Sequence, residues 1–107
     1  MGATMQLAEL SNAALQKHIR ALAKDSSKVF ITEHARDRML ERRVSDVEVI
    51  ECLRRGVIER PSRTDRKTGD LKCTMECFGA SRNLAVVAAL SDERSDAIVV
   101  TVLTRTR

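Results

Sequence analysis

The stretch from His34 to Arg43 combines residue types that are suited to chemistry on a phosphate group. If this stretch is helical, His34, Arg38 and Arg42 fall at positions i, i+4 and i+8 and form one polar stripe. Histidine exchanges a proton near neutral pH, and arginine presents a planar fork of donors that matches phosphate oxygens. The spacing therefore predicts a phosphate site in which His34 carries the proton and the two arginines hold the phosphate.

An ordinary surface helix is the alternative explanation of the same residues. A single histidine in the first turn of a helix is more often a hydrogen-bonded structural residue than a catalytic one. Arg38 and Arg42 are also close enough in sequence to pair with Glu41, Asp46 or Glu48. RNA transesterification needs a base, an acid and cations, and a second proton donor requires that burial raise the pKa of a neighbouring glutamate.

The composition limits the classes of protein to which the chain can belong. Its 107 residues suffice for one domain, and 43% hydrophobic with 32% charged residues is typical of a globular protein. The net charge of +4, with more arginine than lysine, is compatible with an anionic partner such as RNA. Aromatic residues make up only 2%, which disfavours a platform for stacked bases and leaves Phe30 and Phe78 as the only candidates.

The sequence predicts neither a membrane segment nor a metal site. Its apolar runs are shorter than the ~20 residues that span a bilayer, and no signal peptide is evident, so a cytoplasmic protein is expected. The two histidines lie far apart without a carboxylate cluster, so neither a metal nor another cofactor is expected. Cys73 and Cys77 share one face of a predicted strand at roughly 13 Å, which is too far for a disulfide. All three cysteines, including Cys52, are interpreted as small core residues.

Helices are expected in the first half of the chain. Apolar residues at helical spacing predict a helix over 5–24, and a short extended segment follows at 29–31. A second helix is expected to continue to about Arg43, and a third is expected to bury Val47 among its apolar residues. The residues expected to begin or end these two helices are Thr32, then Ser45 with Glu48 as a capping box, and Gly56.

Strands are expected after the helices. A strand that Pro61 places at an edge is predicted over 57–63, and a turn with a positive φ is predicted at Gly69. Three more strands are predicted at 71–78, 83–90 and 97–104. The last two are apolar on both faces, as central strands are. The expected architecture of the whole chain is a single α+β domain, with N-terminal helices followed by a small antiparallel β-meander.

The order and spacing of several of these residues resemble a known family. They are His34-Ala35, Arg38-Met39 and Arg42, then Val44-Ser45 and Glu48, then Gly56 and Ile58, followed by the meander. Over residues 28–104 the chain is similar to a small bacterial and phage family catalogued as domain of unknown function 4258, which leaves the 5–24 helix as an addition. That family looks like a relative of the RelE and BrnT ribonuclease toxins, in which helices precede a small antiparallel sheet.

The resemblance implies a ribonuclease fold with a basic cleft, and the first hypothesis for its function is a metal-independent ribonuclease of toxin–antitoxin type. Such enzymes drive a ribose 2′-hydroxyl onto the neighbouring phosphate. His34, Arg38 and Arg42 would then be catalytic, and nearby cations and one hydroxyl would bind the substrate. These substrate-binding residues are Arg36, Arg43, Thr104 and Arg105. The implied partners are RNA and a cognate antitoxin or another protein.

A non-catalytic binding module on the same fold is the alternative hypothesis. RelE-type toxins often use a tyrosine near the C-terminus, and this sequence contains no tyrosine. The fold would then bind a protein or a nucleic acid without cleaving it. A protein of a mobile element that acts through a sheet edge is a third alternative. The 5–24 helix is expected either to cover the side of the sheet that would otherwise face solvent or to form a homodimer.

Overall fold

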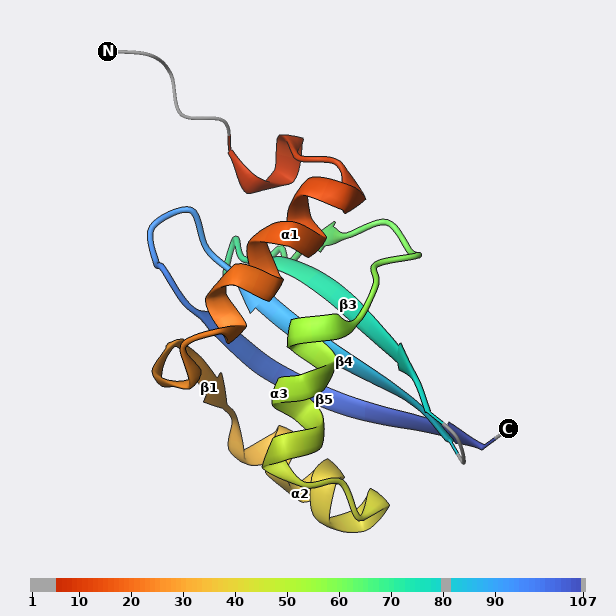
Figure 1. Cartoon of the computed structure of the whole chain (residues 1–107). Coiled ribbons are helices and arrows are strands. Elements are labelled where there is room, and N and C mark those ends of the chain that lie inside the picture. Colours follow the sequence, from red (N-terminus) through yellow and green to blue (C-terminus); the bar gives the residue numbers. More distant parts are fainter. Residues whose placement is uncertain (1–5, 80–81, 107) are drawn as a thin grey trace.

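Three α-helices and a five-stranded mixed sheet make up the part of the chain that the structure describes, residues 6–79 and 82–106 of a computed structural model. The helices are α1 (Asn12–Ala23), α2 (Glu33–Arg42) and α3 (Asp46–Arg55). The strands are β1 (Val29–Ile31), β2 (Arg63–Thr64), β3 (Leu71–Phe78), β4 (Arg82–Leu90) and β5 (Ala97–Thr106). α1 and α3 lie across one face of the sheet, and α2 packs against β5 (Figure 1). The expected α+β class is confirmed, and none of the described helices is long and apolar enough to cross a membrane.

The sheet has the strand order β1-β5-β4-β3-β2, and β1 runs parallel to β5 while the other pairs are antiparallel. The predicted antiparallel meander is therefore only part of a mixed sheet. β1 pairs with β5 from Val29 opposite Ala97 to Ile31 opposite Val99. Backbone groups along the outer edge of β5 need partners, and a three-residue segment far away in sequence supplies them.

The observed N-terminal helix, α1, is shorter than the helix predicted over 5–24. A 3₁₀ turn at Leu7–Glu9 precedes α1, and Met5 lies outside the described residues. Ser11 separates the two elements because its backbone is extended and its side chain accepts a hydrogen bond from the backbone N–H of Ala14 at 3.1 Å. Serine is a favourable N-cap residue, so the helix begins after it.

Two further details differ from the sequence prediction. The expected strand over 57–63 is reduced to a single bridge between Val57 and Glu76 and to the two residues of β2. Pro61 lies between them and has no N–H to donate, which accounts for the interruption. Val47 is 70% exposed instead of buried, because α3 turns Val49 and the residues one turn further on toward the core.

Local signals for caps and turns are confirmed. Thr32 accepts a hydrogen bond from the N–H of Ala35, and Ser45 with Glu48 forms both hydrogen bonds of the capping box. Gly69 has a φ of 78° in the hairpin turn before β3. Gly56 follows α3 as expected, but its backbone is extended. The helix that ends in a left-handed residue is α2, whose C-cap Arg43 has a φ of 55°.

The helices cover one face of the sheet, and the core lies between them. Its largest buried side chains include Ile19 of α1, Leu53 of α3 and Val86 of β4. Cys52 and Cys73 are buried in this core as predicted, whereas Cys77 is partly exposed.

Alternate residues of β3, β4 and β5 point to the opposite face, which we call the open face because no described helix covers it (Figure 1). The cross-strand rows of the open face are Thr74–Val87–Thr101, Glu76–Ala85–Leu103 and Phe78–Asn83–Arg105.

Candidate functional site

The N-terminus of α2 is fixed on β5 by Thr32. Its hydroxyl donates to the carbonyl of Val99 at 3.0 Å and accepts from the N–H of Ala35 at 3.1 Å. Ala35 and Met39 are buried under the helix, so the helix turns its opposite stripe outward. His34 is accordingly exposed, and its side chain has no hydrogen bond or ion pair within the described part of the chain.

The two arginines predicted to hold a phosphate share one carboxylate. Arg38 Nη1 donates to Glu41 Oε2 at 2.6 Å, and Arg42 Nη1 approaches the same oxygen at 3.4 Å. The pairing with Glu41 that the sequence left as an alternative is therefore present. None of the five main cavities among the described residues is lined by His34, Arg38 or Arg42. His34 of the predicted catalytic stripe is exposed, and Arg38 and Arg42 are partly exposed.

Arg36 and Arg43, predicted to bind substrate, lie at the junction between α2 and α3. Arg36 Nη1 pairs with Asp46 Oδ1 at 3.3 Å, which links the second helix to the first turn of the third. Arg43 lies between the two helices, and its backbone adopts the left-handed conformation. Both residues thus have places in the connection between the two helices.

Arg82 is the residue of this junction that sequence reasoning missed. Its guanidinium donates to the carbonyls of Arg42 and Arg43 at 2.7 and 2.8 Å, and to Glu48 Oε2 at 2.9 Å. The hydrogen bond from Arg82, followed by the one from the backbone of Ser45, holds the pKa of Glu48 below its ordinary value. No local sequence pattern marks Arg82, because its partners Arg42, Arg43 and Glu48 precede it in the chain by 40, 39 and 34 positions.

The structure separates the two predicted binding residues of β5. Thr104 pairs with Leu84 on the helix-covered face, and Arg105 pairs with Asn83 on the open face. Successive residues of a strand point to opposite faces, so the two side chains do not converge. The predicted site residues are therefore distributed over the outer stripe of α2, the α2–α3 junction and both faces of the sheet.

One end of the open face is strongly basic. A groove of about 410 Å³ lies where β2 and the turn after it meet β3. The cations that line this groove, which we call the hairpin groove, are Arg60, Arg63, Arg66 and Lys72. Its one acidic lining residue, Asp65, pairs with Lys72 at 3.0 Å, and that hydrogen bond lowers the pKa of Asp65. Three arginines with no ion pair among the described residues remain around the groove.

The other end of the open face holds a smaller cavity of about 110 Å³. Phe78 is 54% exposed there, beside Asn83 and Arg105. The Oδ1 atom of Asn83 is buried yet accepts no hydrogen bond in the described structure. Composition alone disfavoured a platform for stacked bases, but Phe78 lies on the open face beside this cavity. Phe30 points to the same side of the sheet from β1, because its neighbours Val29 and Ile31 pack against the core.

A second basic groove, of about 620 Å³, lies between α1 and α3 on the helical face. Its arginines act largely within the protein. Arg20 donates to the carbonyl of Gly56 at 2.9 Å, and Arg54 donates to the carbonyl of Ala23 at 2.7 Å. Each arginine thus satisfies a carbonyl at the C-terminal end of the other helix, where orphan acceptors need donors. Lys17 and Lys24 are exposed at its rim, as is Arg55, which pairs with Glu51 at 3.2 Å.

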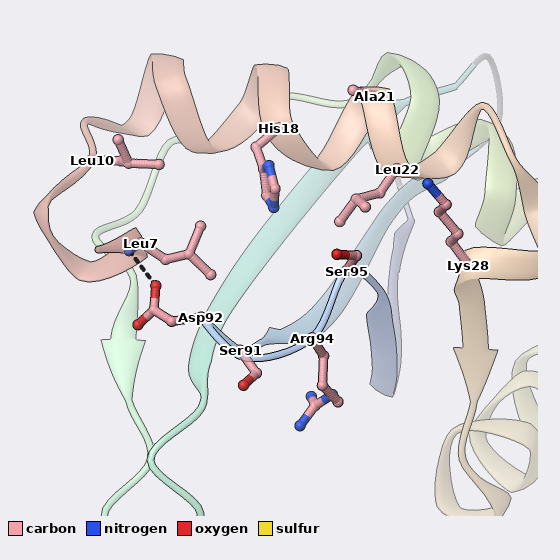
Figure 2. Close-up of a pocket in the computed structure, with 10 residues that line it drawn as sticks. All are labelled: Leu7, Leu10, His18, Ala21, Leu22, Lys28, Ser91, Asp92, Arg94 and Ser95. Carbon is pink, nitrogen blue, oxygen red and sulfur yellow. Dashed lines mark hydrogen bonds between the residues drawn. The ribbon is translucent and has the colours of Figure 1, made fainter. Parts of the chain in front are cut away.

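His18 belongs to another pocket, remote in sequence from His34. The pocket, of about 540 Å³, lies between α1 and the loop that joins β4 to β5, and Figure 2 shows the imidazole directed into it. Asp92 accepts a hydrogen bond from the N–H of Leu7 at 2.7 Å and so ties the N-terminal 3₁₀ turn to this loop. No group of histidine, cysteine and acidic residues suited to a metal ion occurs among the described residues.

Comparison with protein families identifies the class of this α+β chain. The family described as "Domain of unknown function (DUF4258)" matches residues 31–104, and the chain belongs to that family. The match spans α2, α3 and most of the sheet. No curated protein and no solved structure matches the sequence.

Proposed function

We propose that this protein binds single-stranded RNA through the open face of its sheet and does not cut it. The observation that carries the proposal is the hairpin groove, where four cations surround a single carboxylate that is itself paired. Arginine and lysine contacts to phosphates supply most of the affinity of nucleic-acid binding. Arginine forks also match phosphate oxygens in pairs.

The shape of the open face favours a single strand over a duplex. No described helix lies on this face, so none there can enter a groove of double-stranded nucleic acid. Open sheet surfaces, by contrast, bind single strands whose bases are splayed apart. Along β3, the six residue steps from Lys72 to Phe78 span ~20 Å. That length accommodates a few nucleotides between the hairpin groove and the exposed phenylalanine.

Binding without cleavage follows from the surroundings of His34. General acid–base cleavage of RNA needs two proton carriers close to one phosphate. His34 lines none of the five main cavities among the described residues, and the nearby Glu41 is the shared partner of Arg38 and Arg42. The cations that remain available for phosphates line the hairpin groove instead.

The test measures the affinity for a fluorescent oligouridylate by anisotropy at several salt concentrations. The variant Arg63→Glu with Arg66→Glu should bind more than tenfold more weakly, and Arg63→Ala with Arg66→Ala should reduce the salt slope by about 1.4, since a single strand contributes about 0.7 per phosphate contact. Lys17→Glu with Lys24→Glu is the matched control, because it makes the same change of charge on the helical face. Equal losses in the two charge-reversal variants would refute a site on the open face.

A metal-independent ribonuclease is the second candidate function, with a cognate antitoxin as its protein partner. The observation that favours it is the exposed side chain of His34, one helical turn before Arg38. Incubation of the purified protein with total bacterial RNA in EDTA tests it, beside His34→Ala. Cleavage by the wild-type protein that is lost in His34→Ala would replace the binding proposal with the ribonuclease.

A further inference from the structure

We infer that the small cavity at the Phe78 end of the open face is a binding pocket for a guanine base. The inference rests on the proposed function, because it gives one nucleotide of the bound RNA a defined place. The pocket is built by the row Phe78–Asn83–Arg105, which takes one residue from each of β3, β4 and β5. Side chains directly opposite each other on neighbouring strands lie roughly 5 Å apart at their Cβ atoms. The three side chains therefore surround one small space.

Phe78 provides a face on which a planar base can stack. Its ring is 54% exposed, so one face is open to a ligand. In the neighbouring row, Ala85 lies between Glu76 and Leu103 and has the smallest side chain of the three. A small residue between larger ones leaves a depression beside the phenylalanine, and its volume of about 110 Å³ suits one base rather than a whole nucleotide.

The polar groups of the pocket are mainly hydrogen-bond acceptors. Asn83 Oδ1 is buried without a partner among the described residues, although a buried acceptor without a hydrogen bond is costly. The carboxylates of Glu59 and Glu76 line the same cavity. A ligand that donates several N–H groups would satisfy the two carboxylates.

Guanine fits this set better than the other bases. Its N1–H and 2-amino group are adjacent donors that a single carboxylate can accept together, and its O6 and N7 atoms accept from an arginine fork. Arg105 is the one cation that lines the pocket. Uracil offers one N–H donor, and adenine presents an acceptor where guanine presents N1–H. Arg105, which the family resemblance implied as a substrate-binding residue, contacts the base in this assignment.

The experiment compares oligouridylates of about eight nucleotides, within the site sizes known for single-strand binders, that carry one central guanosine, adenosine, cytidine or uridine. Wild-type protein should bind the guanosine oligomer about tenfold more tightly than the uridine oligomer. Phe78→Leu should weaken binding of the guanosine oligomer about tenfold, because it keeps an apolar side chain but removes the ring. Phe30→Leu is the matched control, since Phe30 is equally exposed, at 53%, but lies on β1.

Two further variants separate base recognition from folding. Asn83→Ala and Glu76→Gln should remove the preference for guanosine while the thermal midpoint by circular dichroism stays unchanged. Tight binding of oligouridylate with no preference among the four oligomers would overturn the guanine pocket and leave the proposed function standing. If no oligomer binds at low salt, titration with guanosine monophosphate decides: resonances of Phe78 and Asn83 that do not move overturn the pocket as well.

Discussion

Replacement of Arg82 by methionine tests the central connection of this fold, which joins the sheet to the α2–α3 junction. The side chain is 30% exposed and makes three hydrogen bonds, two to backbone carbonyls and one to Glu48. Each bond from the charged guanidinium to a carbonyl contributes about 1 kcal/mol when partial exposure is taken into account, and the ion pair adds less than about 1 kcal/mol. Methionine keeps the aliphatic contacts of the arginine stem. Arg82→Met should therefore lower the free energy of unfolding by about 2 kcal/mol.

Urea unfolding followed by circular dichroism measures this change, provided that the slope with denaturant stays constant between variants. Lys67→Met is the control, because it removes a cation whose side chain lies exposed in the hairpin loop. The control should change the free energy of unfolding by less than about 0.5 kcal/mol. An equally small change in Arg82→Met would refute the reasoning that Arg82 holds the helical junction on the sheet.

Three further changes have defined outcomes. Gly56→Ala would place a Cβ atom in steric overlap with the backbone oxygen of Cys52 in α3, so it should lower the free energy of unfolding by at least ~2 kcal/mol in urea. The pKa of Glu48 is lowered in the folded state, so its stabilisation is present at neutral pH and is lost as pH falls below 4.5. The difference in unfolding free energy between wild type and Glu48→Gln should therefore be larger at pH 7 than at about pH 3. Of the three thiols, Cys77 should react first with iodoacetamide in mass spectrometry, because burial raises the pKa of Cys52 and Cys73; faster labelling of a buried thiol would contradict this core.

The parts of the fold that local chemistry determines were predictable from the sequence. Thr32 and Ser45 mark helix starts because their side chains satisfy backbone N–H groups a few residues away. The parallel pairing of β1 with β5 was not predictable, because it joins segments that two helices separate and β1 has only three residues. The position of Val47 was also mispredicted, since an apolar residue in the first helical turn matches the core pattern whether or not it is buried.

The candidate site was less predictable than the fold, for a related reason. His34, Arg38 and Arg42 do form one stripe, but only the packing of α2 on β5 decides whether that stripe faces a cavity or solvent. Phe78 and Asn83 carry no recognisable motif. They become neighbours through the β3–β4 register, and the apolar residues on both faces of β4 concealed that one face is open.

The most direct test of the account is to map the RNA contact by NMR. Protein labelled with ¹⁵N and ¹³C is titrated with a single-stranded oligomer, and side-chain resonances are followed on every surface. We expect shifts for the Arg63 and Arg66 guanidinium groups and for the Phe78 ring, while the imidazole of His34 and the Lys17 side chain stay unchanged. Shifts confined to His34 and its neighbours on α2, or to the groove between α1 and α3, would contradict binding through the open face.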